Sequence, residues 1–182
     1  MIEPIQKEEC EASFSRQICE NNSIEKYTRE FNYPKDSYIV SKDDIPRKGL
    51  KAFFFSDASS AIRRKIFKEI NGYDQKKFPT NEDMYIAYKI ITKGYKIKYC
   101  ADSEIVHSHQ FTLKQYYNRY LDTGKFFKEN SYLNNYKVNQ AGGNMAKYVF
   151  RRAIEDRNWK VLIEFIPNMA VRFIAMLIGK KE

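Results

Sequence analysis

The sequence has few residues that could build a disulfide framework or a structural zinc site. It contains three cysteines, Cys10, Cys19 and Cys100, and no two of them are spaced as a Cys-x-x-Cys pair. An odd number of cysteines cannot all pair within one chain. This pattern favours a reducing compartment and argues against both a disulfide scaffold and a zinc knuckle.

Long apolar runs are also scarce. The N-terminal stretch MIEPIQKEECEA is charged and lacks the hydrophobic segment of a signal peptide. No run of about 20 uninterrupted apolar residues occurs, so an ordinary transmembrane span is not predicted. We therefore expect a cytoplasmic protein.

The C-terminal tail WKVLIEFIPNMAVRFIAMLIGKK is the most apolar part of the chain. Pro167 is expected to break it, which would leave a second part too short to span a bilayer. With Arg172 and two terminal lysines, the tail could lie at the inner membrane face, its cations near anionic head groups. Packing on the domain or on a partner is the alternative, and both remain open.

Glycine and proline are few, with 7 and 5 in 182 residues, while 43% of the residues are hydrophobic. A disordered or fibrous chain is therefore excluded, and one domain with a real core is expected. The 14 tyrosines and 13 phenylalanines suit core packing first and sugar-stacking platforms second. The net charge of +9 favours phosphate-bearing partners, but the basic residues form no long run, so no nucleic-acid binding is predicted.

Hydrophobic periodicity and capping signals predict helices alternating with a few short strands. Strands are expected at 14–18, 52–56 and 96–100, with 104–107 extending the last or starting another. Helices are expected at 22–31, 61–70, 80–93, 112–129, 145–156 and 159–178, with loops at 35–50 and 130–144. Capping boxes are predicted at Asn22–Glu25, Thr80–Asp83 and Thr112–Gln115. This order predicts an α/β protein with a mixed sheet flanked by helices, and too few strands for a complete sheet.

Three groups of residues are candidates for a catalytic or binding role. Glu82 and Asp83 open a helix, where they either cap it or hold a carboxylate base ready for a hydroxyl proton. His107 and His109 are the only histidines; two apart in a strand, they would face one side and could ligate a metal, or form a surface pair. Arg119 lies beside an aromatic residue, where it could hold a diphosphate or only solvate a helix face.

In this order the features resemble the acceptor-side, C-terminal half of family 2 glycosyltransferases of GT-A fold, closest to rhamnosyltransferase-like members. The resemblance rests on the runs RQICENNSIEKYTREFNYP and FFFSDASSAIRRKIFKEINGYDQKKFPTNEDMYIAYKIITKGYKIKYCADSEIVHSHQFTLKQYYNRYLDTG. It implies that residues 1–129 are the C-terminal half of a GT-A domain and that residues 130–182 are a helical extension able to associate with membranes.

The resemblance also implies roles for individual residues. Asp83 would deprotonate the acceptor hydroxyl for inverting attack on the anomeric carbon, with Glu82 beside it. His107, or less favourably His109, would complete the shell of a divalent cation, and Arg119 would lie near the donor diphosphate. The strand and loop on the acceptor side would be formed by Phe54, Phe55, Ser56 and Asp57.

Two departures from the family pattern stand out. The family's Gln-x-x-Arg-Trp-like element is replaced here by Gln115 and Arg119-Tyr120, with one extra residue between. No Asp-x-Asp motif precedes residue 81, and Asp43-Asp44 lies in a predicted polar loop. The nucleotide-binding half and the main ligands of a Mn or Mg ion are therefore expected to lie upstream, outside this chain, and the chain alone is expected to have little activity.

The sequence thus predicts transfer of a sugar, with dTDP-rhamnose as one candidate donor, to a bacterial surface polysaccharide or a lipid-linked acceptor. The alternative is a non-catalytic module that keeps the acceptor cleft and binds a polysaccharide or a partner. The two readings differ in whether an upstream donor half acts together with these residues.

Overall fold

The structure, a computed structural model, describes residues 1–137 and 141–182. These residues form two compact units that interleave along the sequence. The sheet unit comprises Met1–Gln17, Pro34–Ile105 and Tyr136–Asn139, and the helical unit comprises Ile18–Tyr33, Val106–Asn135 and Gln140–Glu182. The division expected from the sequence, 1–129 and 130–182, follows a different criterion and stays a prediction.

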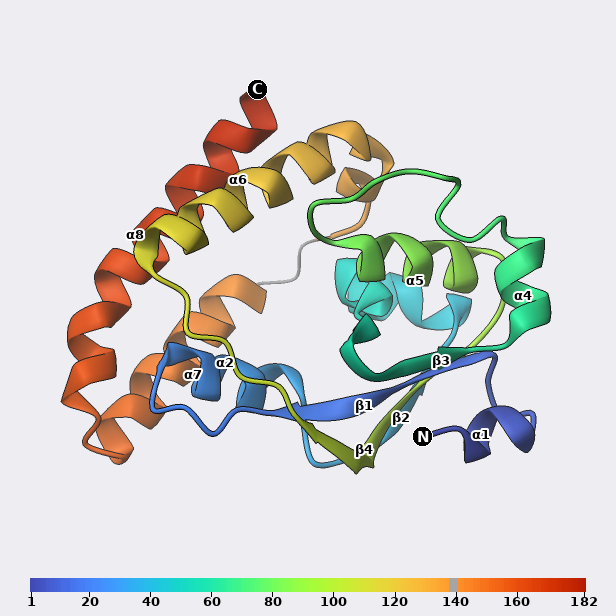
Figure 1. Cartoon of the computed structure of the whole chain (residues 1–182), viewed down its shortest axis with the longest axis horizontal. Helices are drawn as coiled ribbons and strands as arrows, with labels where there is room; N and C mark the ends of the chain where they lie inside the picture. Colours follow the sequence, from blue (N-terminus) through green and yellow to red (C-terminus); the bar gives the residue numbers. More distant parts are fainter. Residues whose placement is uncertain (138–140) are drawn as a thin grey trace. The chain divides into compact units, whose positions relative to one another are not determined.

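The sheet has four strands in the order β2-β4-β1-β3 (Figure 1). Their bounds are β1 Ala12–Ile18, β2 Tyr38–Val40, β3 Ser60–Ile62 and β4 Ile97–Val106. β3 pairs antiparallel with β1, and β2 pairs antiparallel with β4. The Glu11 N–H bonds to the Lys96 carbonyl and the His107 N–H to the Ile18 carbonyl, so β1 and β4 run in the same direction. The predicted mixed sheet is confirmed.

The core of the sheet unit is aromatic on the sheet and aliphatic on its main helix. Phe14 of β1 lies 5.3 Å from Phe55 and 5.2 Å from Tyr99, measured between ring centroids. Helix α5 (Glu82–Thr92) covers this layer with a fully buried face that includes Ile86 and Ile90. The predicted helix at 80–93 is therefore confirmed in type and place.

Three local predictions for the sheet unit were wrong. Residues 52–56 form no strand; they lie at the end of the 3-10 helix η2 (Gly49–Phe53) and in the extended segment after it. The run is still largely buried, because Phe53 packs on Tyr88 and Tyr136. A short apolar run marks burial but cannot tell a strand from a buried turn.

The other two wrong predictions are a loop and a helix. The predicted loop at 35–50 contains β2, the 3-10 helix η1 (Lys42–Asp44) and helix α3 (Ile45–Lys48). The helix predicted at 61–70 is strand β3 followed by the shorter helix α4 (Arg64–Glu69). Pairing with β1 holds residues 60–62 extended, which overrides their helical periodicity. Outside these regions lies one further short helix, α1 (Glu3–Gln6).

The helical unit consists of α2 (Ile24–Asn32), α6 (Leu113–Glu129), the 3-10 helix η4 (Ser131–Asn135), α7 (Ala141–Glu155) and α8 (Trp159–Lys181). The capping box at Thr112 and Gln115 is confirmed, because each side chain bonds to the backbone N–H of the other. The box predicted at Asn22 does not form: Ser23 is the N-cap, and its hydroxyl makes no cap bond. The predicted loop at 130–144 contains η4 and the start of α7, and residues 138–140 of it lie outside the described part.

Helices α6 and α8 lie side by side (Figure 1) because two glycines let their backbones meet. A Cβ atom built on Gly124 would lie 2.4 Å from the Met176 carbonyl oxygen. One built on Gly179 would lie 2.0 Å from the Leu121 carbonyl oxygen. Real Cβ atoms do not approach backbone so closely, so glycine is required at both positions for this contact.

Helix α8 is continuous, which corrects the prediction that Pro167 breaks the tail. It is the one helix in residues 1–137 and 141–182 that is long and apolar enough to cross a membrane, judged by length and composition only. Length and composition do not decide whether a helix crosses a membrane, so the expectation that the chain has no ordinary transmembrane span stays a prediction.

Candidate functional site

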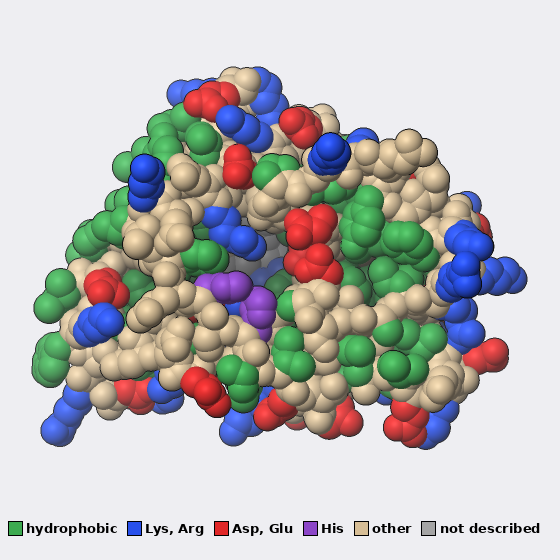
Figure 2. All heavy atoms as spheres, viewed as in Figure 1, with side chains coloured by type: hydrophobic (Ala, Val, Ile, Leu, Met, Phe, Trp, Pro, Cys, Tyr) green, Lys and Arg blue, Asp and Glu red, His purple; other side chains and the backbone are tan. Residues whose placement is uncertain are grey.

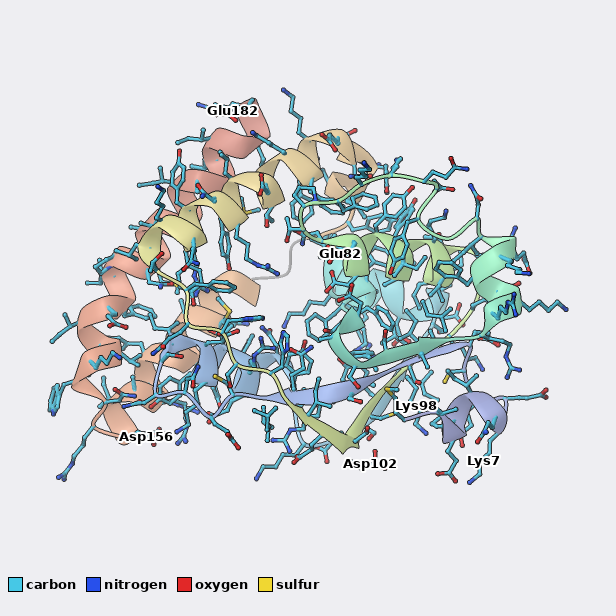
Figure 3. All side chains as sticks on the ribbon, viewed as in Figure 1. Lys7, Glu82, Lys98, Asp102, Asp156 and Glu182 are labelled. Carbon is cyan, nitrogen blue, oxygen red and sulfur yellow. The ribbon has the colours of Figure 1, made fainter. Side chains whose placement is uncertain are left out.

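The acidic start of α5 lies in the sheet unit and is built on an unusual N-cap. Asn81 has φ 65°, in the left-handed region, and none of the side chains expected to form the Thr80–Asp83 capping box caps the helix. Glu82 and Asp83 occupy the first turn, and Figure 3 labels Glu82 at the start of α5. The partial positive charge of the helix N-terminus stabilises carboxylates placed there.

The loop before α5 is held to the helix by Asp74. The Tyr85 hydroxyl donates to Asp74 Oδ2 at 2.6 Å, and the Lys89 ammonium pairs with the same oxygen. Lys89 also donates to the Gly72 carbonyl at 2.9 Å, and the Asn71 amide donates to Asp74 Oδ1 at 2.9 Å. The bond from Lys89, then that from Tyr85, lowers the pKa of Asp74 from 3.8 to about 2.

Tyr73 in this loop lies within the electrostatic influence of nearby carboxylates. Its pKa is raised, first by burial and then by the negative charges of Asp57, Glu82 and Asp83. Asp57 begins the 3-10 helix η3 (Asp57–Ser59) and is exposed. These three carboxylates, whose charges act on Tyr73, are called the acidic cluster of the sheet unit.

The four residues predicted to line the acceptor side differ in accessibility. Asp57 is exposed and Phe54 is partly buried, so both can face a ligand. Phe55 is buried in the core, and the buried Ser56 receives a hydrogen bond from the Gln17 amide. Phe55 and Ser56 therefore position the segment, and the prediction that all four contact an acceptor stays a prediction.

His107 and His109 lie in the helical unit and contact each other directly. Their Nε2 atoms are 2.8 Å apart, so one ring donates a hydrogen bond to the other. The backbone N–H of His109 donates to Glu25 Oε2 at 2.9 Å, and Glu25 pairs with Arg29 at 2.7 Å. Burial, and next the positive charge of Arg29, lower the pKa of His107, which favours the neutral ring.

This histidine pair does not by itself make a cation site. It offers two nitrogen ligands, and no group of three or more His, Cys, Asp or Glu side chains suited to a metal occurs within residues 1–137 and 141–182. Divalent ions in catalytic sites take at least three protein ligands or keep oxygen donors such as carboxylates. The described residues therefore do not complete the predicted Mn or Mg site.

Arg119 is exposed on α6, with its guanidinium carbon 5.9 Å from the centre of the Phe111 ring. A second arginine, Arg172 of α8, was expected from the sequence to lie near anionic head groups, and the structure buries it against α6 instead. It is 6% exposed; its guanidinium carbon lies 4.2 Å from the centre of the Tyr116 ring, and it donates to the Tyr120 hydroxyl at 3.3 Å. The position of Arg172 within an apolar tail does not indicate from the sequence that it contacts Tyr116 and Tyr120.

Sequence comparison identifies two similar proteins. The chain is 40% identical over 105 residues to the O-antigen chain rhamnosyltransferase RfbN of Salmonella typhimurium, covering 58% of this chain and 33% of that protein. It is 37% identical over 128 residues to the O-antigen chain rhamnosyltransferase WbaN of Salmonella anatum, covering 70% of this chain and 40% of that protein.

The chain thus spans between a third and two fifths of the length of these curated relatives. No family model matches the chain, and no solved structure matches it. The comparisons support a rhamnosyltransferase-like resemblance, and the GT-A fold and family 2 membership stay predictions.

Replacing Asp74 tests the network that holds the loop to α5. Because Asp74 has a lowered folded-state pKa, its stabilisation is present above pH 4 and is lost as the pH falls towards 2. We expect Asp74→Asn to lower the unfolding free energy at pH 7 by about 1–2 kcal/mol, allowing for partial solvent screening. Urea unfolding of both proteins from pH 7 to pH 2 should show the difference shrinking to zero.

The exposed Asp43 provides the matched control, and Asp43→Asn should change stability little at any of these pH values. A difference between Asp74→Asn and the native chain that is constant from pH 7 to pH 2 would contradict the network.

Proposed function

We propose that this chain is the acceptor-side part of an inverting glycosyltransferase that extends a bacterial surface polysaccharide. The donor would be a nucleotide-sugar, with dTDP-rhamnose the first candidate, and the acceptor a polysaccharide or lipid-linked glycan. The printed functions of RfbN and WbaN support the reaction class. The observation that carries the site is the position of Glu82 and Asp83 in the first turn of α5, where Asp83 Oδ1 accepts the Met84 N–H at 2.7 Å.

In the proposed reaction Asp83 acts as the general base. An acceptor alcohol is a weak nucleophile near neutral pH, so a carboxylate must take its proton as the new bond forms. The acceptor oxygen bonds to the anomeric carbon, the bond from that carbon to the diphosphate oxygen breaks, and the hydroxyl proton passes to Asp83. Glu82 and Asp57 shape the hydroxyl side of the site, with Phe54 as an apolar wall.

Asp83 is placed well for this role. The helix N-terminus favours its ionised form, and its Oδ1 accepts the Met84 N–H at 2.7 Å, which fixes the side chain. The loop that precedes α5 is tied to this helix by the hydrogen bond from the Tyr85 hydroxyl to Asp74. A carboxylate held in this way needs no rearrangement before it accepts a proton.

The donor nucleotide and its cation would be held together with the part of such enzymes that this chain does not match. We propose that His107 or His109 contributes one ligand to a Mn or Mg ion whose remaining ligands come from that part. Arg119 would lie near the donor diphosphate. The family 2 and GT-A assignments are proposed on the same resemblance, supported by the mixed sheet covered by α5.

The decisive test is a chimera in which this chain's segment replaces the matched 105 residues of RfbN. We expect it to transfer rhamnose from dTDP-rhamnose, and Asp83→Asn to lower kcat by about 10²–10⁴-fold, the usual contribution of a general base. Donor binding, measured by calorimetry, should stay unchanged, because Asp83 acts on the acceptor.

Asp102→Asn, on an exposed carboxylate of β4, is the control and should keep full activity. Equal losses of transfer and donor binding in Asp83→Asn would assign the residue a structural role. A folded chimera that binds acceptor glycan without transferring sugar would favour the alternative, a non-catalytic glycan-binding module.

We further propose that α8 rests on an anionic membrane surface. Its outward side chains form an apolar stripe, 45–76% exposed, that consists of Trp159, Ile163, Ile166, Phe173, Ile174 and Leu177. Figure 2 shows these apolar side chains gathered along the edge that α8 forms. Exposed lysines at 160, 180 and 181 flank the stripe at its two ends. An apolar face bordered by cations and a tryptophan is typical of helices at the lipid interface.

The inner face of α8 decides between lying on a membrane and crossing one. That face packs on α6 and buries Arg172 against two tyrosines, so lipid cannot surround the helix. The arrangement favours a surface position, with the stripe towards lipid.

Co-sedimentation with vesicles of phosphatidylcholine and phosphatidylglycerol checks this position. We expect Ile163→Ser combined with Ile166→Ser to weaken vesicle binding by at least about tenfold, since each side chain contributes about 1.5–3 kcal/mol when fully buried. Ile39→Ser, on an exposed residue of β2, should leave binding unchanged. Unchanged binding by the double variant, or a dimer that the double variant dissociates, would contradict a lipid-facing stripe.

A further inference from the structure

An open cavity lies beside the turn that joins α7 to α8, wholly within the helical unit, so its shape does not depend on the sheet unit. It is lined by Lys26 and Tyr27 of α2 and by residues 156–160 of the turn, of which Asp156 is labelled in Figure 3. Its volume of about 610 Å³ falls within the range of about 300–1,000 Å³ usual for ligand pockets. The proposed catalytic carboxylates, the two histidines and Arg119 are not among its lining residues.

The cavity carries an excess of positive charge. Three of its side chains are cations, Lys26, Arg157 and Lys160, and one is a carboxylate, Asp156. Asp156 is already engaged, because it pairs with Lys26 at 3.5 Å and accepts a hydrogen bond from the Tyr27 hydroxyl at 3.1 Å. Arg157 and Lys160 are exposed and take part in no ion pair among the residues that the structure describes. Two cations without a counter-ion at one cavity attract a phosphate.

Asn158 fixes the turn that carries these cations. It is 9% exposed, and its amide nitrogen donates to the Tyr27 hydroxyl at 3.1 Å and to Asn22 Oδ1. Its own Oδ1 accepts the Val161 N–H at 3.3 Å. Because Tyr27 is fully buried in α2, these bonds hold the turn to that helix. The cations on either side of Asn158 therefore start from a fixed backbone, which lowers the cost of ordering them around a ligand.

Arg157 adopts a backbone conformation that an arginine ordinarily avoids. Its φ is 52°, in the left-handed region. It ends α7 in the manner of a Schellman motif, with the Asn158 N–H bonded to the Ala153 carbonyl at 2.8 Å and the Arg157 N–H to the Ile154 carbonyl at 3.0 Å. Glycine is the usual residue at this position, because it has no Cβ to strain the turn. Strained residues of this kind concentrate at functional sites.

Trp159 connects the cavity to the apolar stripe of α8. It lines the cavity, is 70% exposed and is the first member of that stripe. Ile163 follows four residues later, on the same face of the helix, and is 76% exposed. A molecule that carries a phosphate next to hydrocarbon matches both the cations and the stripe, and a phospholipid is built in this way. A soluble phosphate would use the cationic part alone.

We propose that the cavity at the α7–α8 turn binds the phosphate of an anionic lipid headgroup. Arg157 and Lys160 donate to the phosphate oxygens, and Trp159 lies at the level of the headgroup, where the apolar stripe begins. The choice of a lipid as the source of the phosphate rests on the membrane position proposed above for α8; the excess of positive charge and the strain at Arg157 do not. Such a site gives the chain a preference for lipids that expose a phosphate over other lipids of the same charge.

The test compares two kinds of vesicle with equal surface charge: phosphatidylcholine mixed with phosphatidic acid, and phosphatidylcholine mixed with oleate. Trp159 is the one tryptophan in the sequence, so its fluorescence reports binding beside the cavity. We expect the Kd of the full chain to be about tenfold lower for the vesicles with phosphatidic acid. Glycerol 3-phosphate, which lacks the hydrocarbon, should leave the fluorescence unchanged up to about 10 mM.

Two variants make the result specific. Arg157→Gly should abolish the preference for phosphatidic acid, because the guanidinium is lost, and should raise the melting temperature, because glycine takes a φ of 52° without strain. Lys181→Gln is the control, since it removes an exposed cation from the other end of α8. It should weaken binding to both kinds of vesicle equally and leave the preference intact.

Equal affinity of the native chain for the two kinds of vesicle would overturn the proposal. So would a preference that persists in Arg157→Gly, or one that is lost in Lys181→Gln. A lower melting temperature in Arg157→Gly would assign the arginine to the fold and would overturn it too. A fluorescence change with glycerol 3-phosphate alone would contradict the lipid as the source of the phosphate.

The headgroup site and the membrane position fail separately. Weaker vesicle binding in the variant that combines Ile163→Ser with Ile166→Ser, without a preference for phosphatidic acid in the native chain, would remove only the headgroup site. An Arg157-dependent preference, with undiminished affinity in that double variant, would remove the apolar stripe and keep the phosphate site.

Discussion

The close approach of α6 and α8 at Gly124 and Gly179 fixes which face of the C-terminal helix is buried. Once the two backbones meet there, Arg172 lies against the tyrosines of α6. The apolar stripe is left outside. A side chain at either glycine would push the helices apart and release both arrangements at once.

The same constraint explains how a tail with so many apolar residues can carry two kinds of surface. The inner face of α8 buries Arg172 against Tyr116 and Tyr120 of α6. The outer face exposes bulky apolar groups with lysines near both ends of the helix, which suits an anionic lipid surface.

Within the sheet unit the corresponding constraint is ionic. Asp74 accepts hydrogen bonds from Tyr85 and Lys89 of α5 and thereby fixes the turn that carries Tyr73. The negative charges of Asp57, Glu82 and Asp83 act on the phenol that this turn carries. A base is effective only when its position is set beforehand; here a partly exposed ion pair ties the loop to α5, and the helix N-terminus holds Asp83.

Much of the fold followed from the sequence, because local signals and tertiary packing agree over β1, β4 and the helices α5 to α8. The capping box at Thr112 was predictable because its two members, Thr112 and Gln115, lie three residues apart and form a local sequence pattern. The prediction of a strand at 52–56 was wrong, because a short apolar run indicates burial without indicating which secondary structure is buried. The break at Pro167 failed because packing on α6 outweighs one lost backbone bond.

The candidate site was only partly visible in the sequence. Glu82 and Asp83 were found from their place at a helix start, which is a local property. Tyr73 and Asp74 were missed, because their roles depend on partners in other elements. Side chains whose role is set by tertiary contacts leave no mark in the spacing of a single sequence.

The central claim is that these residues form the acceptor side of a transferase and lack a donor site of their own. Calorimetric titration of the purified chain with dTDP and with UDP, each with and without manganese, tests this claim most directly. The account predicts no binding under any of the four conditions, because the donor-binding part is proposed to lie in the portion of such enzymes that this chain does not match. Clear manganese-dependent binding of either nucleotide would contradict it and would place the donor site within this chain.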